Sequence, residues 1–338
     1  MKGAYEMSKI QIRYISHDDI LSMNIDFKFV VDTVKKVLIE HAAGFYDNPP
    51  KPAVHPDPLS FFHAMPSYLP RLHAAGIKWV SGFSLNPAKG LPAVTGIIVM
   101  NDDITGFPIA VMDCAWSTGI RTGAVSAVAA QYLARKNSEV LSIIGTGIQG
   151  RIHGAFLKTV IGSLKTLKVY DINKDIIESF KKYVNEKTKI DIIVESSYEN
   201  AIRDADIIVT CTGKLSEPVY NKEWVKQGAL VLPVHTCGWT KDFPYTADKF
   251  IADDWIQLRD SHAIPSGYYK TLPEPYCELG KIVAGEKPGR ENDKEIILCH
   301  NMGIALHDIA LAQEIIKIAE NKNIGTMLPL MDFSKNVV

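Results

Sequence analysis

The chain has 338 residues, which exceeds one typical domain and most simply indicates two. Apolar residues make up 46% of it, charged residues 22%, and the formal net charge is −1 without blocks of like charge, so nothing indicates a nucleic-acid or membrane partner. Five scattered cysteines without a C-x-x-C pair, and the lack of a signal-peptide core or of an apolar run near about 18 residues, predict a cytoplasmic protein without a disulfide framework or a metal site.

The first 115 residues predict a mixed α+β domain with a largely antiparallel sheet. Residues 48–58 (NPPKPAVHPDP) are too rich in proline for a central strand or a helix. Short β-like runs follow at IKWVSGF, AVTGIIVM and PIAVMD, separated by Gly, Pro or Asp turns. After them, TGIRTGAVSAVAAQYLARK is small and apolar at helical spacing, which predicts a helix that connects this half to the next.

From about residue 139, apolar strands alternate with helices across short loops. The strand runs are VLSIIG, LKVYD, IDIIVE, DIIVT, ALVLPV and KFIADD. Continuous apolar strands separated by helices indicate a parallel sheet covered on both faces. Residues 303–321 then predict a strong amphipathic helix near the end of the chain. The predicted fold class is therefore α/β, with a Rossmann-type parallel sheet domain beside an α+β domain.

The stretch SIIGTGIQG closes the first parallel strand with the spacing G-x-G-x-x-G, in the strand-to-helix context that a dinucleotide-binding turn requires. Gly145 would permit the turn, Gly147 would let the backbone approach a pyrophosphate, and Gly150 would let helix and strand pack closely. The phosphates would lie on free N–H groups at the helix N-terminus. We therefore predict cofactor contacts at the three glycines and at the residues between them: Thr146, Ile148 and Gln149.

Two further strand ends lie near the predicted cofactor. Asp171 ends the second strand roughly 20 residues after the turn, where a carboxylate accepts hydrogen bonds from the ribose 2′-OH and repels a 2′-phosphate. This favours NAD(H), while the nearby Lys174 leaves NADP(H) open. The fourth strand ends in VTCTG, whose small polar residues either line the nicotinamide side or are ordinary strand-end residues: Thr210, Cys211 and Thr212.

Several motifs together resemble one family. They are GIKWVSGF, GLPAVTGIIVMNDDITGFPIAVMD, IRTGAVSAVAAQYLAR, GTGIQG and GIALHDIALA, in this order over about residues 45–325. The sequence resembles the ornithine cyclodeaminase/μ-crystallin family, which contains ornithine cyclodeaminases, NAD(P)H-dependent ketimine or pyrroline-carboxylate reductases, amino-acid dehydrogenases and a hormone-binding crystallin. The resemblance implies a homodimer of two-domain subunits with the active site between the domains. Residues 1–118 and 305–338 would form the substrate-binding and dimerisation domain, and residues 119–304 the NAD(P)-binding Rossmann domain.

Three cations are candidate ligands for a substrate carboxylate. Arg121 lies in the I-R-T-G motif, and the resemblance implies that its guanidinium holds the α-carboxylate, while Thr122 beside it is expected on the cofactor side. Lys78 lies in an apolar strand, where desolvation would lower its pKa and make it a proton carrier, unless its stem packs while its head stays in water. The resemblance implies carboxylate binding and proton transfer for Lys78. Lys51 replaces an arginine that many relatives carry after the proline pair.

Two other positions depart from the cyclodeaminase pattern. His63, just ahead of Met65 in the predicted substrate pocket, replaces an acidic residue. Thr236, with His235 beside it, replaces an aspartate that is thought to contact the substrate amine and to transfer a proton. Threonine does not ionise at useful pH, so His63 and His235 are the alternative proton carriers, unless each is a structural histidine. The other eight histidines are interpreted as structural or surface residues.

The first functional hypothesis is an NAD(P)H-dependent oxidoreductase that acts on the C–N bond of an α-imino or α-amino acid. The alternatives are an ornithine cyclodeaminase, which reduces and reoxidises NAD+ within one turnover, and a non-catalytic crystallin-like ligand-binding protein. The missing aspartate argues against the cyclodeaminase, and the retained glycine turn and cations argue against the pure binder. The irregular segments 48–58 and 261–269 are candidates to line the pocket, but they do not indicate which side chain the substrate carries.

Overall fold

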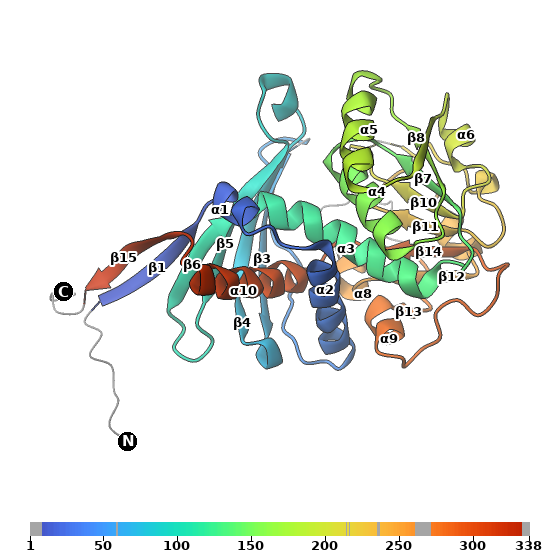
Figure 1. The fold of residues 1–338 in the computed structure, drawn as a ribbon. Coiled ribbons are helices and arrows are strands. Elements are labelled where there is room, and N and C mark those ends of the chain that lie inside the picture. The colour runs from blue at the N-terminus through green and yellow to red at the C-terminus, as the bar shows by residue number, and fades with distance from the viewer. Residues whose placement is uncertain are drawn as a thin grey trace.

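The computed structural model describes residues 9–58, 60–213, 215, 217–234, 237–260 and 272–332. Within these residues the chain forms one sheet of seven strands and one of eight strands. Helix α3 (Ala115–Leu133) runs from the first sheet to the second, and Figure 1 shows the two sheets on either side of it. The predicted α/β fold with a Rossmann-type sheet is confirmed.

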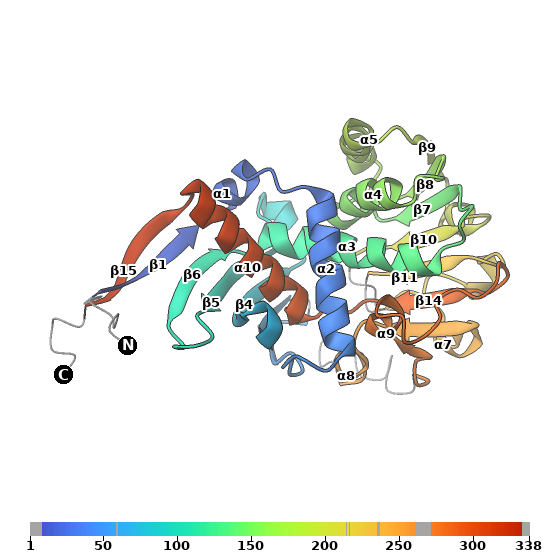
Figure 2. The same ribbon diagram turned by 60° about the horizontal axis from the view of Figure 1, so that its bottom comes forward.

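The seven-stranded sheet has the order β15-β1-β6-β5-β4-β3-β2, and its neighbours are antiparallel except for the parallel pair β1 and β6. Helix α10 packs against β3, β4 and β5, with α2 beside it (Figure 2). We call the face that α10 covers the inner face. The elements of this half are β1 (Lys9–Ile15), α1 (His17–Ser22), α2 (Phe27–Ala42), β2 (Ala53–Val54), β3 (Ser60–Leu69), η1 (Pro70–Leu72), β4 (Ala74–Phe83), η2 (Asn86–Lys89), β5 (Val94–Asn101), β6 (Pro108–Asp113), α10 (Ala305–Lys322) and β15 (Thr326–Asp332).

The eight-stranded sheet has the order β13-β12-β14-β11-β10-β7-β8-β9, and all its neighbours are parallel. The chain moves outward from β7 to β8 and β9 and then returns to β10 on the other side of β7. The switch point between β7 and β10 is where such sheets bind ligands. The elements are β7 (Val140–Ile144), α4 (Ile148–Val160), β8 (Thr166–Tyr170), α5 (Asp175–Lys187), β9 (Asp191–Val194), α6 (Tyr198–Ile202), β10 (Ile207–Thr210), η3 (Lys222–Trp224), β11 (Leu230–Pro233), α7 (Phe243–Thr246), β12 (Lys249–Ala252), α8 (Trp255–Arg259), β13 (Cys277–Glu278), α9 (Leu279–Val283) and β14 (Ile297–His300).

Strand β3 and the 16-residue helix α2 are two elements that the sequence analysis did not predict. The β3 segment SFFHAMPSYL carries Pro66, which lacks the N–H group of a central strand. The structure tolerates this proline because β2 pairs only with Phe62 and His63, so β3 is an edge strand where Pro66 lies. The proline-rich segment before it contributes only the two residues of β2, in agreement with its composition.

Two further features concern the chain as a whole. No helix within the described ranges combines the length and the apolar character needed to cross a membrane. All five cysteines are free thiols, and four of them are buried.

Candidate active site

A cavity of about 430 Å³ lies between the two sheets. Its walls come from the inner face of β3 and β4, from α3 and from the segments that follow β10, β11 and β14. The carboxyl ends of parallel strands therefore reach it, which is the usual ligand position in an α/β sheet. Its lining residues are Lys51, His55, Ser60, Phe61, His63, Met65, Lys78, Val80, Gly82, Phe83, Ser84, Ala93, Val94, Thr118, Arg121, Thr212, Gly213, Val234, His300, Asn301 and Met302.

Three buried charged side chains from distant parts of the chain meet at the cavity wall. The Nζ atom of Lys78 on β4 lies 2.7 Å from one carboxylate oxygen of Asp308 on α10, and Nε of Arg121 on α3 lies 3.3 Å from the other. Burial lowers the pKa of Lys78, and the Asp308 carboxylate opposes this shift. Burial would raise the pKa of Asp308, but the two cations outweigh it and hold the pKa below its usual value. The sequence analysis predicted both cations and missed Asp308.

A fourth charged group, Lys51, reaches the same wall from the segment before β2. Its Nζ donates a hydrogen bond to the carbonyl of Met302 at 3.1 Å, and burial lowers its pKa to about 8. The N–H groups of Met302 and Gly303 in turn donate to the buried carboxylate of Asp253, at 3.0 and 2.6 Å. Gly303 has φ of +75°, and a Cβ there would collide with the guanidinium of Arg121. Asp253 therefore fixes the loop against which two cavity cations lie.

The glycine turn after β7 has the geometry that its spacing predicts. Gly145 adopts φ of +97°, and a Cβ there would lie 2.7 Å from the carbonyl oxygen of Cys211. A Cβ at Gly147 would have no heavy atom within 4 Å among the described residues, so this N-cap of α4 faces open space. A Cβ at Gly150 would collide with the carbonyl of Gly145. The three glycines thus permit the turn, leave room at a helix N-terminus and bring helix and strand together, as a dinucleotide site requires.

Asp171 at the end of β8 lies against this turn. Its carboxylate accepts hydrogen bonds from the backbone N–H of Thr146 at 2.7 Å and from the Thr146 hydroxyl at 3.0 Å. Ile148 at the start of α4 is exposed, and the side-chain carbonyl of Gln149 is buried without a hydrogen-bond partner in the described part of the chain. The residues of the glycine turn and Asp171, all predicted to hold a cofactor, therefore lie together.

Comparison with known proteins gives this arrangement a family. A sequence model described as "Ornithine cyclodeaminase/mu-crystallin family" matches residues 19–323. The chain belongs to the ornithine cyclodeaminase/μ-crystallin family.

Three relatives show how far the similarity extends. The "Nodulation efficiency protein NfeD" of Rhizobium meliloti is 36% identical over 94% of this chain and 98% of its own length. A solved structure of Thermococcus litoralis Δ(1)-pyrroline-2-carboxylate reductase, in complex with NADH and L-proline, is 30% identical with a TM-score of 0.84 and covers 93% of this chain and 99% of that chain. An archaeal alanine dehydrogenase dimer with bound NAD is 29% identical with a TM-score of 0.82, with coverages of 94% and 99%.

At the end of β10 this family member uses only one of three predicted side chains to line the cavity. Thr212 lines it, whereas Thr210 is fully buried and its hydroxyl accepts a hydrogen bond from Nε1 of Trp239 at 3.2 Å. The thiol of Cys211 donates to the carbonyls of the β7 end, at 3.4 and 3.1 Å. Thr122 on α3 likewise donates its hydroxyl to a carbonyl within its own helix, at 2.7 Å. The side chains of Thr210, Cys211 and Thr122 are thus engaged within the fold.

The histidines of the site were only partly anticipated. His63 and Met65 line the cavity, and Met65 lies directly opposite Lys78 in the sheet. His55 and His300, which the sequence analysis interpreted as structural or surface residues, also line the cavity. The candidate catalytic residues His235 and Thr236, and the segment 261–269, lie outside the described residues. The position of His300 at the carboxyl end of an apolar strand, and of His55 shortly before β3, was the signal that could have identified these two histidines.

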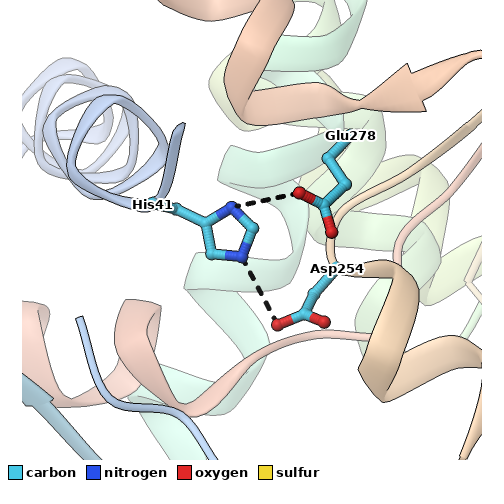
Figure 3. A group of neighbouring side chains, drawn as sticks. All are labelled: His41, Asp254 and Glu278. Atoms are coloured by element: carbon cyan, nitrogen blue, oxygen red, sulfur yellow. Dashed lines mark hydrogen bonds and ion pairs between the residues drawn. The ribbon is translucent and has the colours of Figure 1, made fainter. Parts of the chain in front are cut away.

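One cluster of possible metal ligands lies away from the cavity, where α2 meets α8 and β13 (Figure 3). Nε2 of His41 lies 3.4 Å from the carboxylate of Asp254, and Nδ1 lies 3.9 Å from the carboxylate of Glu278. The imidazole ring therefore lies between the two carboxylates, whereas a metal ion would bind one ring nitrogen together with both. The geometry suits a buried polar contact that joins the two halves of the chain.

Proposed function

We propose that the chain is an NAD(H)-dependent oxidoreductase that acts on the C–N bond of an α-imino or α-amino acid. The observation that carries this proposal is the group of three cations, Lys51, Lys78 and Arg121, on the wall of a cavity that meets the carboxyl ends of a Rossmann-type sheet. Cations in this arrangement suit a carboxylate. The pyrroline-carboxylate reductase holds NADH and L-proline and the alanine dehydrogenase holds NAD, which supports the same cofactor and substrate class here.

The glycine turn and Asp171 are the groups that would hold the cofactor. The open space at Gly147 and the free N–H groups of the α4 N-terminus suit a pyrophosphate. The Asp171 carboxylate suits a ribose with a free 2′-OH, which favours NAD(H) over NADP(H). When bound, the nicotinamide supplies a hydride to the imino carbon or removes one from the amino acid.

The side chains of the cavity hold the substrate and carry its proton. Arg121 offers a planar guanidinium to the α-carboxylate, and Lys51 adds a second positive charge. Asp308 orients Arg121 and Lys78 by pairing with both. Since burial lowers the pKa of Lys78, its Nζ gives a proton to the imine nitrogen during reduction and takes it back during oxidation. This anchoring fixes the reacting carbon, and such positioning supplies a large part of an enzymatic rate.

The direct test follows NADH absorbance during incubation with pyrroline-2-carboxylate, piperideine-2-carboxylate, or pyruvate with ammonia. We expect net oxidation of NADH with at least one of them. In a parallel assay, ornithine with a catalytic amount of NAD+ should release no ammonia, since release without net NADH would instead identify a cyclodeaminase. Retained NADH binding without either reaction would favour the crystallin-like binder.

Replacing Arg121 tests the carboxylate site. Arg121→Ala should raise the apparent KM by about 100-fold or more, because a charge-assisted bidentate contact is lost from a buried site. The Kd for NADH should stay within about twofold of the parent value, because Arg121 lies outside the glycine turn. Arg121→Lys keeps the charge without the planar fork, so its apparent KM should lie between those of the parent chain and Arg121→Ala. Steady-state kinetics with fluorescence titration of NADH measures both quantities, and an unchanged KM in Arg121→Ala would contradict the assignment.

We also propose a homodimer built on the outer face of the seven-stranded sheet. On this face Trp79 of β4 lies directly opposite Ile97 of β5, and both are more than two-fifths exposed. Phe62 stacks on Trp79 with ring centroids 5.6 Å apart. Such apolar surface suits an interface between two copies of the chain, and the similar alanine dehydrogenase is a dimer. Pairing of β15 with β1 and packing of α10 on the same sheet support residues 1–118 and 305–338 as the substrate and dimerisation domain.

A further inference from the structure

The part of the cavity lined by His63, Val80, Phe61 and Gly82, which we call the outer half of the cavity, has no role in the chemistry proposed above. Along the inner face of β3 and β4, the position next to Lys78 is taken by His63 opposite Val80, and the one after it by Phe61 opposite Gly82. All of these residues line the cavity. A substrate side chain that extends from the held carboxylate along this face must therefore pass His63.

His63 is held firmly but has an unused nitrogen. The ring of Phe61 stacks on its imidazole, with centroids 4.1 Å apart and planes inclined by 23°. Gly82 gives that ring its place, because a Cβ there would collide with Phe61. Nε2 of His63 is buried and has no hydrogen-bond partner among the described residues. Because an unpaired buried nitrogen is costly, a ligand that supplies the partner gains affinity.

The charges around the cavity favour an uncharged side chain. Three cations, Lys51, Lys78 and Arg121, face two buried carboxylates, Asp253 and Asp308, which leaves a single positive charge. The substrate α-carboxylate balances that charge. No Asp or Glu lines the cavity within the described part of the chain, so a cationic side chain finds no counter-ion there. Among the described residues, a second carboxylate would likewise find no remaining cation.

We infer that the outer half of the cavity is a subsite for an amino-acid or imino-acid side chain that is uncharged and carries one carboxamide or hydroxyl group, hydrogen-bonded to Nε2 of His63. The inference rests on the proposed function. Both groups donate and accept hydrogen bonds, so they pair with either tautomer of His63. Phe61, Phe83 and Val80 form an apolar wall for the methylene groups that lead to it. Burial and the cations nearby lower the pKa of His63 to about 4, so the ring is neutral at pH 7.

The test compares four straight-chain amino acids of similar length, titrated calorimetrically into the protein saturated with NADH. The Kd of L-glutamine should be about five- to tenfold lower than that of L-norleucine, the apolar match. It should be lower than the Kd values of L-glutamate and L-lysine by a larger factor. His63→Phe keeps a ring against Phe61 and should bring glutamine and norleucine within about twofold of each other. His63→Gln restores a hydrogen-bonding group and should restore the preference. Thermal unfolding of both variants checks that they fold.

Three outcomes would overturn the subsite: tightest binding of lysine or glutamate, a glutamine preference that His63→Phe leaves unchanged, or no binding of any of the four. Turnover is judged separately, from the oxidation of NADH by imino acids. A glutamine preference that depends on His63, in a protein without turnover, would support the subsite and contradict the proposed oxidoreductase.

Discussion

At the scale of single residues, Lys51 predicts how activity changes with pH. Burial lowers its pKa to about 8, so Lys51 is cationic below that pH and loses its charge as the pH rises through it. If the charge binds the substrate carboxylate, kcat/KM should fall about tenfold between pH 8 and pH 9.5. Lys51→Arg should remove this decline, because an arginine stays protonated throughout the range. Steady-state rates at saturating cofactor measure this decline in kcat/KM. An identical decline in Lys51→Arg would assign the ionisation to another group.

Asp308 shows what residue patterns can and cannot reveal. Lys78 and Arg121 could be predicted, since one is a charge within an apolar strand and the other belongs to a recognisable motif. Asp308 carried a similar signal, because it lies on the buried side of α10, four residues after Ile304 and three before Leu311. A carboxylate on the apolar stripe of a helix indicates a buried partner. The pattern could not name the partners, which lie 187 or more residues away.

At the scale of elements, Asp254 predicts how strongly the two halves are joined. It is the N-cap of α8, accepting from the N–H of Gln257 at 2.9 Å, and it also accepts from Asn48 at 3.0 Å and faces His41. Asp254→Ala should lower the free energy of unfolding by about 2–4 kcal/mol, since it removes a cap and leaves buried polar groups unpaired. Asp254→Asn keeps the capping oxygen and should lose less than half as much. Chemical denaturation measures both, and equal losses in the two variants would contradict the capping role.

The contacts of Asp254 also determine how its contribution to stability changes with pH. Burial would raise the pKa of Asp254, but hydrogen bonds from His41 and from the N–H of Gln257 hold it below its usual value. Its stabilising contribution is therefore complete above the unfolded carboxyl pKa of about 3.9 and is lost as the pH falls through the folded value. The difference in stability between the parent chain and Asp254→Ala should narrow below about pH 4.

Elements were easiest to predict where one local pattern decided them. The predicted apolar runs after residue 139 became parallel strands. Strands β7, β10, β11 and β12 are buried, since alternation is not required where both faces of a sheet are covered, whereas β9 at the sheet edge is largely exposed. Strand β3 was not predicted, and its Pro66 argues against a central strand. Pro66 is tolerated because β2 pairs with only two residues of β3. The length of β2 is set by the proline-rich segment before β3, so a neighbouring element decided the outcome.

At the scale of the whole molecule, the cavity could not be predicted from the order of residues alone. Its walls combine the inner face of an antiparallel sheet, one linking helix and three strand ends of a parallel sheet. Local patterns predicted β4, α3, β10 and β11, but they predicted neither β3 and β14 nor that all these elements surround one cavity. The glycine turn is the exception, because its spacing and its strand-to-helix context specify a geometry within nine residues, and Gly145, Gly147 and Gly150 have that geometry.

The oligomeric state is the prediction that belongs to the molecule as a whole. The proposed dimer would cover Trp79 and Ile97, so the double variant Trp79→Glu with Ile97→Glu would place charges in an apolar interface. The parent chain should sediment at about twice 37.4 kDa at micromolar concentration, and the double variant at the monomer mass. Tyr245→Glu, an exposed position on α7 in the other half, should remain dimeric. A monomeric parent chain, or a double variant that stays dimeric, would mean that the outer face of the seven-stranded sheet is not the interface.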